Sequence, residues 1–192
     1  MGAATVFSEL KRREASGEPI QVGLIGAGAM GLGIAHQIGR TPGMRLSFIA
    51  DKSGDAAREA AHLYAKPTHV ATDGVAALND PAIPCDVLVE ATNSIVAAFG
   101  YCMAAIEKGA HCVLMNAEID AVLGYLLRDA AARKGVVVTS DAGDQHGLLA
   151  RVSRVSQHKQ DQETKFPIQC RKRGQSVRYN LQSNSSHRSR ID

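Results

Sequence analysis

The sequence predicts an α/β fold of the Rossmann type, a doubly wound parallel sheet of about six strands followed by a disordered basic tail. Short apolar runs alternate with helical segments along most of the chain, which calls for a parallel sheet covered by helices on both faces. No hairpin signal interrupts this alternation. Near Arg151 the composition changes abruptly, and this change predicts where the folded part ends.

The chain begins with a predicted amphipathic helix over residues 4–15, which a turn at residues 16–19 ends. Ile20 to Ile25 is a short apolar run bounded by turn residues, the pattern of a strand buried on both faces. Similar runs predict further strands at 45–50, 69–72, 86–91, 111–115 and 136–139. Helical spacing predicts helices at 30–40, 55–65, 75–78, 96–108 and 121–134.

These patterns divide the chain into an N-terminal helix and linker over 1–19, a dinucleotide-binding domain over 20–152 and a tail over 153–192. Residues 1–150 carry 12 Lys and Arg against 16 Asp and Glu, a net charge of −4. Residues 151–192 carry 10 against 3, a net charge of +7, and only 9 of these 42 residues are hydrophobic. Such a stretch buries too little apolar surface to offset its ordering entropy, so we expect no packed structure there.

Composition also excludes several classes of protein. No apolar run reaches the roughly 18 residues of a membrane span, and the charged N-terminus lacks the apolar core of a secretory signal. The four cysteines show no C-x-x-C spacing, so we expect no metal site and mostly buried thiols in a reducing cytoplasm. Trp is absent and aromatic residues make up 4% of the chain, which disfavours a nucleic-acid partner. The expected partner is a small-molecule substrate.

A glycine-rich loop is the most informative motif. Gly26, Gly28 and Gly31 form G-x-G-x-x-G directly after the first predicted strand and at the start of a helix. Gly26 permits the tight turn, Gly28 lets the backbone approach a pyrophosphate, and Gly31 allows close packing of the helix. Ala29 and Met30 lie at the helix N-terminus, where free N–H groups and the positive end of the helix dipole favour phosphate. The motif predicts a dinucleotide site.

The end of the second predicted strand bears on the choice of cofactor. Asp51 lies 20 residues beyond Gly31, where an acidic side chain accepts hydrogen bonds from the ribose hydroxyls of NAD. Lys52 follows it, and a cation at this position can neutralise the 2′-phosphate of NADP. A solvent-exposed Asp-Lys turn is the alternative interpretation. We therefore predict NAD(P), with the choice between the two forms open.

Polar segments follow three of the later predicted strands. Ligands of open α/β sheets bind outside the carboxyl ends of the strands, so these segments are candidates for the nicotinamide and substrate end. They are residues 90–94, 116–118 and 141–147. Glu118 is the candidate catalytic residue, because reduction of a carbonyl requires proton transfer, and His146 is an alternative acid or base. Many of these polar residues would serve equally well as helix caps or turn residues.

Three segments also carry a family resemblance: Ile20 to Gly31, Val113 to Glu118, and Gly143-Asp144-Gln145. Over about residues 5–152 the chain resembles the homoserine dehydrogenase-like oxidoreductases that carry a C-terminal SAF domain. That group includes enzymes similar to 1-deoxy-D-xylulose 5-phosphate reductoisomerase, which make methylerythritol phosphate with NADPH. The resemblance implies a cofactor domain with the glycine loop around the cofactor. It also implies that four residues face the nicotinamide side: Thr92, Asn93, Asn116 and Glu118.

The chain departs from this family in two respects. Members usually have a proline after Gly-Asp-Gln, where this chain has His146. Members also continue into a catalytic and dimerisation domain and then the SAF domain, whereas the matching sequence here stops near Val152. This pattern indicates a truncated or frameshifted product, expected to have little dehydrogenase activity. The resemblance implies a homo-oligomer, but the dimer interface belongs to the missing part.

The sequence is therefore compatible with three functions. The first is an NAD(P)-dependent oxidoreductase, cytoplasmic and present as its cofactor-binding part. The second is a non-catalytic dinucleotide-binding module or inactive gene fragment, which needs the fold but no substrate domain. The third is binding of nucleic acid or another anionic surface by the +7 tail, and the scattered charge of that tail favours a solvated surface instead.

Overall fold

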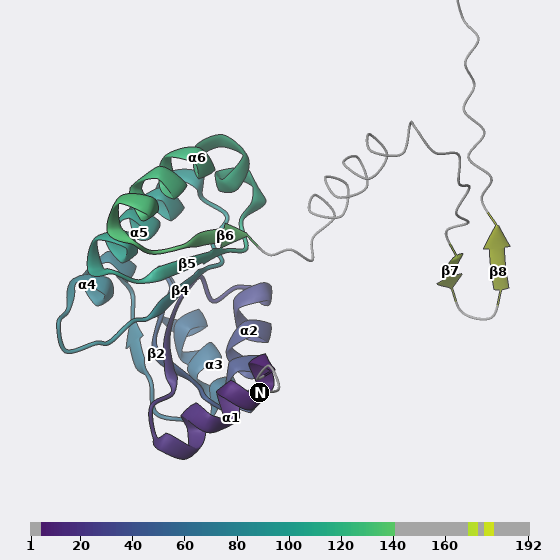
Figure 1. The fold of residues 1–192 in the computed structure, drawn as a ribbon, viewed down its shortest axis with the longest axis horizontal. Helices are drawn as coiled ribbons and strands as arrows, with labels where there is room; N and C mark the ends of the chain where they lie inside the picture. The colour runs from purple at the N-terminus through teal and green to yellow at the C-terminus, as the bar shows by residue number, and fades with distance from the viewer. Residues whose placement is uncertain (1–4, 141–168, 173–174, 179–192) are drawn as a thin grey trace, which may run out of the picture. The chain divides into compact units, whose positions relative to one another are not determined.

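The structure is a computed structural model that describes residues 5–140, 169–172 and 175–178 (Figure 1). The chain divides into two compact units, residues 1–147 and residues 148–192. The first unit contains the predicted α/β fold.

A six-stranded parallel sheet forms the centre of the first unit, in the order β3-β2-β1-β4-β5-β6 (Figure 1). Its strands are β1 (Ile20–Ile25), β2 (Met44–Ala50), β3 (His69–Ala71), β4 (Val87–Glu90), β5 (His111–Leu114) and β6 (Val138–Ser140). Every pairing between neighbouring strands is parallel. The strand order reverses between β1 and β4, which creates the crevice where open α/β sheets bind ligands. The predicted fold is confirmed.

Helices cover both faces of the sheet. They are α1 (Val6–Ser16), α2 (Ala29–Arg40), α3 (Gly54–Tyr64), α4 (Gly74–Asn79), α5 (Ile95–Lys108) and α6 (Ala117–Lys134). Apolar residues of α2 and α3 share one core cluster with Val22 and Leu24 of β1, whereas those of α4, α5 and α6 share a second cluster with Ile25. The strands are thus buried on both faces, which explains why they appear in the sequence as continuous apolar runs.

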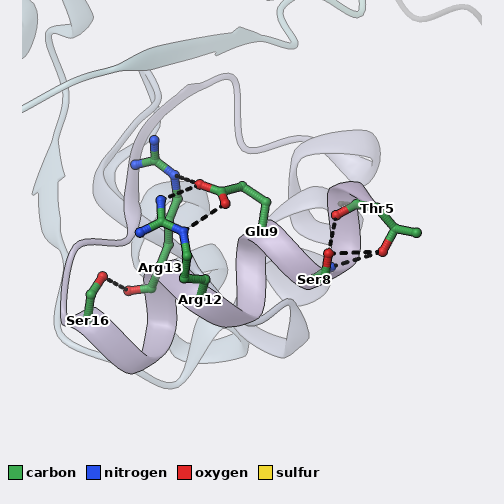
Figure 2. A network of polar contacts seen from close by, with 6 residues as sticks. All are labelled: Thr5, Ser8, Glu9, Arg12, Arg13 and Ser16. Carbon is green, nitrogen blue, oxygen red and sulfur yellow. Dashed lines mark hydrogen bonds and ion pairs between the residues drawn. The ribbon is translucent and has the colours of Figure 1, made fainter. Parts of the chain in front are cut away.

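The first helix is held by polar contacts at its surface (Figure 2). Thr5 is its N-cap and accepts a hydrogen bond from the Ser8 backbone N–H. The Glu9 carboxylate pairs with Arg12 at 2.6 Å and with Arg13 at 3.4 Å, and the hydrogen bond from Arg12 lowers the pKa of Glu9 (Figure 2). No residue of α1 is buried. These contacts stabilise the helix locally and are exposed, so their contribution to folding is small.

The second unit contains a hairpin of two antiparallel strands, β7 (Gln169–Lys172) and β8 (Gln175–Arg178). No strand is expected here from the sequence, so the hairpin departs from that expectation. Two residues separate the strands and the second is glycine, the spacing of a short hairpin loop, a local signal that average composition hides. The predicted boundary at residue 152 and the rest of the predicted tail lie outside the described residues. Within the described ranges no helix is long and apolar enough to cross a membrane.

Candidate functional site

A cavity of about 350 Å³ opens at the carboxyl ends of β1, β2 and β4. It lies where the strand order reverses, the position that the fold favours for a nucleotide. Eight of the residues predicted for cofactor binding line it: Gly26, Gly28, Ala29, Met30, Asp51, Lys52, Thr92 and Asn93. Two others, Gly31 and Asn116, lie outside this lining.

Glycine occupies the three positions of the loop for different structural reasons. Gly26 has φ +99°, and a Cβ there would lie 2.6 Å from the backbone of Ala91. A Cβ at Gly31 would lie 2.0 Å from the carbonyl oxygen of Gly26. A Cβ at Gly28 would meet no protein atom within 4 Å, and Gly28 has φ −69°, which any residue can adopt. The fold requires Gly26 and Gly31, whereas at Gly28 it leaves open space beside the cavity.

The N-terminus of α2 differs from those of the other helices between Val6 and Lys134. Five of these six helices have a side-chain cap that accepts from their first amides: Thr5, Ser53, Asp73, Ser94 and Asn116. The N-cap of α2 is Gly28, and no side chain caps this helix. Its first N–H groups therefore remain available at the edge of the cavity, with the positive end of the helix dipole behind them.

Asp51 extends from the end of β2 to the glycine loop. Its Oδ2 accepts a hydrogen bond from the Ala27 N–H at 2.8 Å, and its Oδ1 accepts one from the Ser53 N–H at 2.8 Å. Each carboxylate oxygen has a further lone pair, so the side chain can still accept from a ligand hydroxyl. Lys52 lies beside it and is exposed. Asp51 thus braces the loop and faces the cavity at once.

Another wall of the cavity is the segment that joins β4 to α5, which lies beside Gly26 of the glycine loop. Thr92 and Asn93 line the cavity there, as do Ser94 and Ala97 at the start of α5. The Asn116 Nδ2 donates to the Thr92 carbonyl oxygen at 3.0 Å, which ties this wall to the end of β5. Asn116 therefore acts on the cavity through Thr92 and does not itself line it.

Asn116 and Glu118, both predicted on the nicotinamide side, lie at the N-terminus of a helix and not in a loop. Helix α6 begins at Ala117, four residues before the predicted start, because Asn116 caps it: its Oδ1 accepts from Glu118 N and Ile119 N at 3.1 and 3.2 Å. Asn116 is 5% exposed. Glu118 occupies the first turn, is exposed and is absent from the cavity lining. His146 and the rest of segment 141–147 lie outside the described residues.

Sequence reasoning missed six residues of the cavity lining: Ile25, Ala50, Thr72, Gly74, Ala97 and Tyr101. Thr72 and Gly74 follow β3, so the rule that ligands bind at the carboxyl ends of strands could have found them. Tyr101 lies in the middle of α5, in an apolar helical stretch that typically packs in a core. No sequence signal marks it as a cavity residue.

The described cysteines and acidic residues form no second site in the part of the chain that the structure describes. Cys102 and Cys112 are fully buried, and burial raises the pKa of the half-buried Cys85 thiol to about 11, so none is activated as a nucleophile. Among the described residues no group of three His, Cys, Asp or Glu side chains is placed to hold a metal ion.

Comparisons with known proteins agree with this geometry. The family model described as "Homoserine dehydrogenase, NAD binding domain" matches residues 26–140. No curated protein sequence matches the chain.

Solved structures share the fold. A homoserine dehydrogenase from Thiobacillus denitrificans is 28% identical, with a TM-score of 0.52, over 65% of this chain and 30% of that one. GenD2 from gentamicin A biosynthesis, solved in complex with NAD, is 18% identical with a TM-score of 0.54, over 74% and 40%. The WlbA dehydrogenase from Bordetella pertussis, in complex with NADH and UDP-GlcNAcA, is 19% identical with a TM-score of 0.53, over 73% and 43%. The chain thus spans less than half the length of these proteins.

Proposed function

Because the chain belongs to the homoserine dehydrogenase NAD-binding family, we propose that the cavity at the glycine loop binds the dinucleotide of an NAD-dependent oxidoreductase. The single observation that supports this most strongly is the open space at Gly28. The protein itself has no need of glycine there, whereas a pyrophosphate approaching the backbone does.

Different residues around the cavity suit the different chemical groups of such a cofactor. The uncapped first turn of α2 offers its N–H groups to the pyrophosphate. Asp51 offers carboxylate oxygens to ribose hydroxyls, and Thr92 and Asn93 form the wall toward the nicotinamide side. When bound, the nicotinamide supplies a hydride donor or acceptor. The protein orients it and excludes water from one side.

The finer parts of the proposal concern cofactor form and substrate. Lys52 offers a positive charge beside Asp51, so NADP is a second candidate cofactor. The family resemblance suggests homoserine-like substrates, or a substrate of the 1-deoxy-D-xylulose 5-phosphate reductoisomerase-like enzymes, in a cytoplasmic homo-oligomer. Glu118 remains the predicted proton-transfer residue, and its exposed position leaves it accessible to a substrate.

Calorimetric titration of the full chain with NAD, NADH and NADP tests this proposal. Gly28→Val fills the open space and should weaken binding of every form at least about tenfold, because the lost approach removes several phosphate contacts. Gly33→Val is the matched control: Gly33 lies in the same helix, is exposed, and also has no atom within 4 Å of its Cβ position, but it does not line the cavity. Equal binding by the two variants would refute the site.

A further inference from the structure

Two polar or charged side chains are buried in the described part of the chain, Glu90 and Asn116. Both make hydrogen bonds to Thr92. Glu90 is the last residue of β4 and is fully buried. Asn116 comes shortly after β5, the strand that neighbours β4 in the sheet. Buried polar groups are costly, so their meeting at one residue of the cavity wall calls for an explanation.

The contacts hold Thr92 by each of its polar groups. Its backbone N–H donates to the Glu90 Oε1 at 2.8 Å, and its hydroxyl donates to the same oxygen. Its carbonyl oxygen accepts from the Asn116 Nδ2 at 3.0 Å. Asn116 is in turn fixed as the cap of α6, and the Glu90 carbonyl oxygen accepts from the Met115 N–H at 2.8 Å. Thr92 therefore connects the ends of β4 and β5.

Burying these polar groups costs more free energy than packing an apolar side chain in the same place. The second carboxylate oxygen of Glu90, Oε2, is buried and has no hydrogen-bond partner among the described residues. Burial raises the pKa of Glu90, and the Thr92 hydrogen bonds only partly oppose that effect. Among the described residues the Cys102 thiol of α5 also interacts with it, and a hydrogen bond with Cys112 together with burial raises the pKa of Cys102, so that thiol stays neutral. An apolar side chain at this position would avoid the cost of an unsatisfied oxygen.

We propose that Glu90 is a positioning residue, which with Asn116 fixes Thr92 so that the Thr92–Asn93 wall is preorganised for the cofactor. This inference rests on the proposed function. A wall segment that is already ordered loses less conformational entropy when a ligand binds, so the benefit of these contacts is realised in affinity more than in stability. The role belongs to the acceptor oxygen of Glu90 and not to its charge.

Two substitutions at Glu90 separate the effect of its hydrogen-bond acceptor from the effect of its side-chain volume. Glu90→Gln keeps an oxygen that can accept from Thr92, and we expect NAD affinity within about threefold of wild type. Glu90→Met has similar length but no acceptor of comparable strength, and we expect affinity about tenfold weaker, the effect of losing roughly one net hydrogen bond. Amide hydrogen exchange of Thr92, followed by NMR in the full chain, should be fast in Glu90→Met and slow in wild type and Glu90→Gln.

Asn116→Asp provides a second test that does not depend on Glu90→Met folding. It keeps a cap oxygen for α6 but replaces the Nδ2 donor to Thr92, so NAD affinity should fall several-fold while α6 stays capped. The inference is wrong if wild type binds NAD and both Glu90→Met and Asn116→Asp bind it equally well. It is also wrong if Glu90→Gln is impaired as much as Glu90→Met, which would assign the effect to charge. Failure of wild type to bind any nicotinamide dinucleotide would instead refute the proposed function, and this role with it.

Discussion

The N-termini of α2 and α6 look similar in the sequence but differ in the structure. Each follows the end of a parallel strand, and cofactor-binding residues are predicted from the sequence at both. At α6, Asn116 is buried and its side chain occupies the first amides of the helix. At α2, the cap is a glycine with no side chain, and the space above it is open.

The difference shows how a fold distinguishes a binding end from a structural end. An amide that a side chain already satisfies has no donor left for a ligand, whereas a free amide at a cavity edge attracts an anion. We therefore propose the α2 terminus as the ligand site, and the α6 terminus is tied to the wall of the cavity through Thr92. Four changes, from the largest expected effect to the smallest, would break or sharpen this contrast.

The largest effect is expected at Gly31. A Cβ there would lie 2.0 Å from the Gly26 carbonyl oxygen, a backbone atom that cannot move without moving the loop. Gly31→Ala should lower the free energy of unfolding by about 3 kcal/mol, the cost typical of overpacking. Gly28→Ala, whose Cβ meets nothing, should change it by less than about 0.5 kcal/mol. Urea denaturation measures both, and similar losses would contradict the division between structural and ligand-facing glycines.

The next effect concerns the closed terminus. Asn116→Ala removes two hydrogen bonds at the start of α6 and the tie to Thr92, so we expect a loss of about 2 kcal/mol of stability. Ser53→Ala removes the exposed cap of α3 and should cost about 1 kcal/mol. Thermal and urea unfolding of the two variants compare a cap that also supports the cavity with one that does not. A smaller loss for Asn116→Ala than for Ser53→Ala would contradict its bridging role.

Much of the fold is readable from the sequence because the signals are local. The first strand, its glycine loop and the following helix have apolar runs, glycines and helical spacing in the order that the fold needs. Asp51 could also be found, since it stands where its strand ends. The start of α6 could not be placed, because Asn116 fits a loop ligand and a helix cap equally well from sequence alone.

The remaining residues of the site depend on long-range packing. Glu90 ends an apolar strand and looks like a polar residue at the edge of the cavity, yet it is fully buried. Tyr101 reaches the cavity from the middle of α5, a position that only the packing of that helix against the sheet determines. In both cases the three-dimensional environment, and not the residue type, assigns the role.

A third prediction separates the charge of Glu90 from its acceptor role. Burial raises the pKa of Glu90 above the value near 4.5 expected in the unfolded chain, so the folded state binds the proton more tightly. Protonated Glu90 thus contributes to the free energy of unfolding at acidic pH, and this contribution is lost as the pH rises through the folded-state pKa. Glu90→Gln does not titrate and should be more stable than wild type at neutral pH by about 1 kcal/mol.

The control for that prediction is the pH dependence itself. The difference in unfolding free energy between Glu90→Gln and wild type should shrink as the pH is lowered toward 4.5. Urea denaturation across this range measures it. A difference that does not change with pH would show that Glu90 is not held against its preferred charge state.

The smallest effect is expected at the two residues that we propose contact the adenosine ribose of the cofactor, Asp51 and Lys52. Asp51→Ala removes acceptors for ribose hydroxyls and also the brace to the Ala27 and Ser53 amides, so it should weaken NAD more than NADP, whose 2′-phosphate the carboxylate repels. Asp51→Asn retains an oxygen for one of these amides and separates the two contributions. Lys52→Ala should weaken NADP selectively, by about threefold, because an exposed charge contributes less than about 1 kcal/mol. Calorimetric titration with both cofactors measures these changes. Equal shifts in both affinities for every variant would show that neither residue discriminates at the ribose, and the free amides of α2 would then account for binding by the phosphates alone.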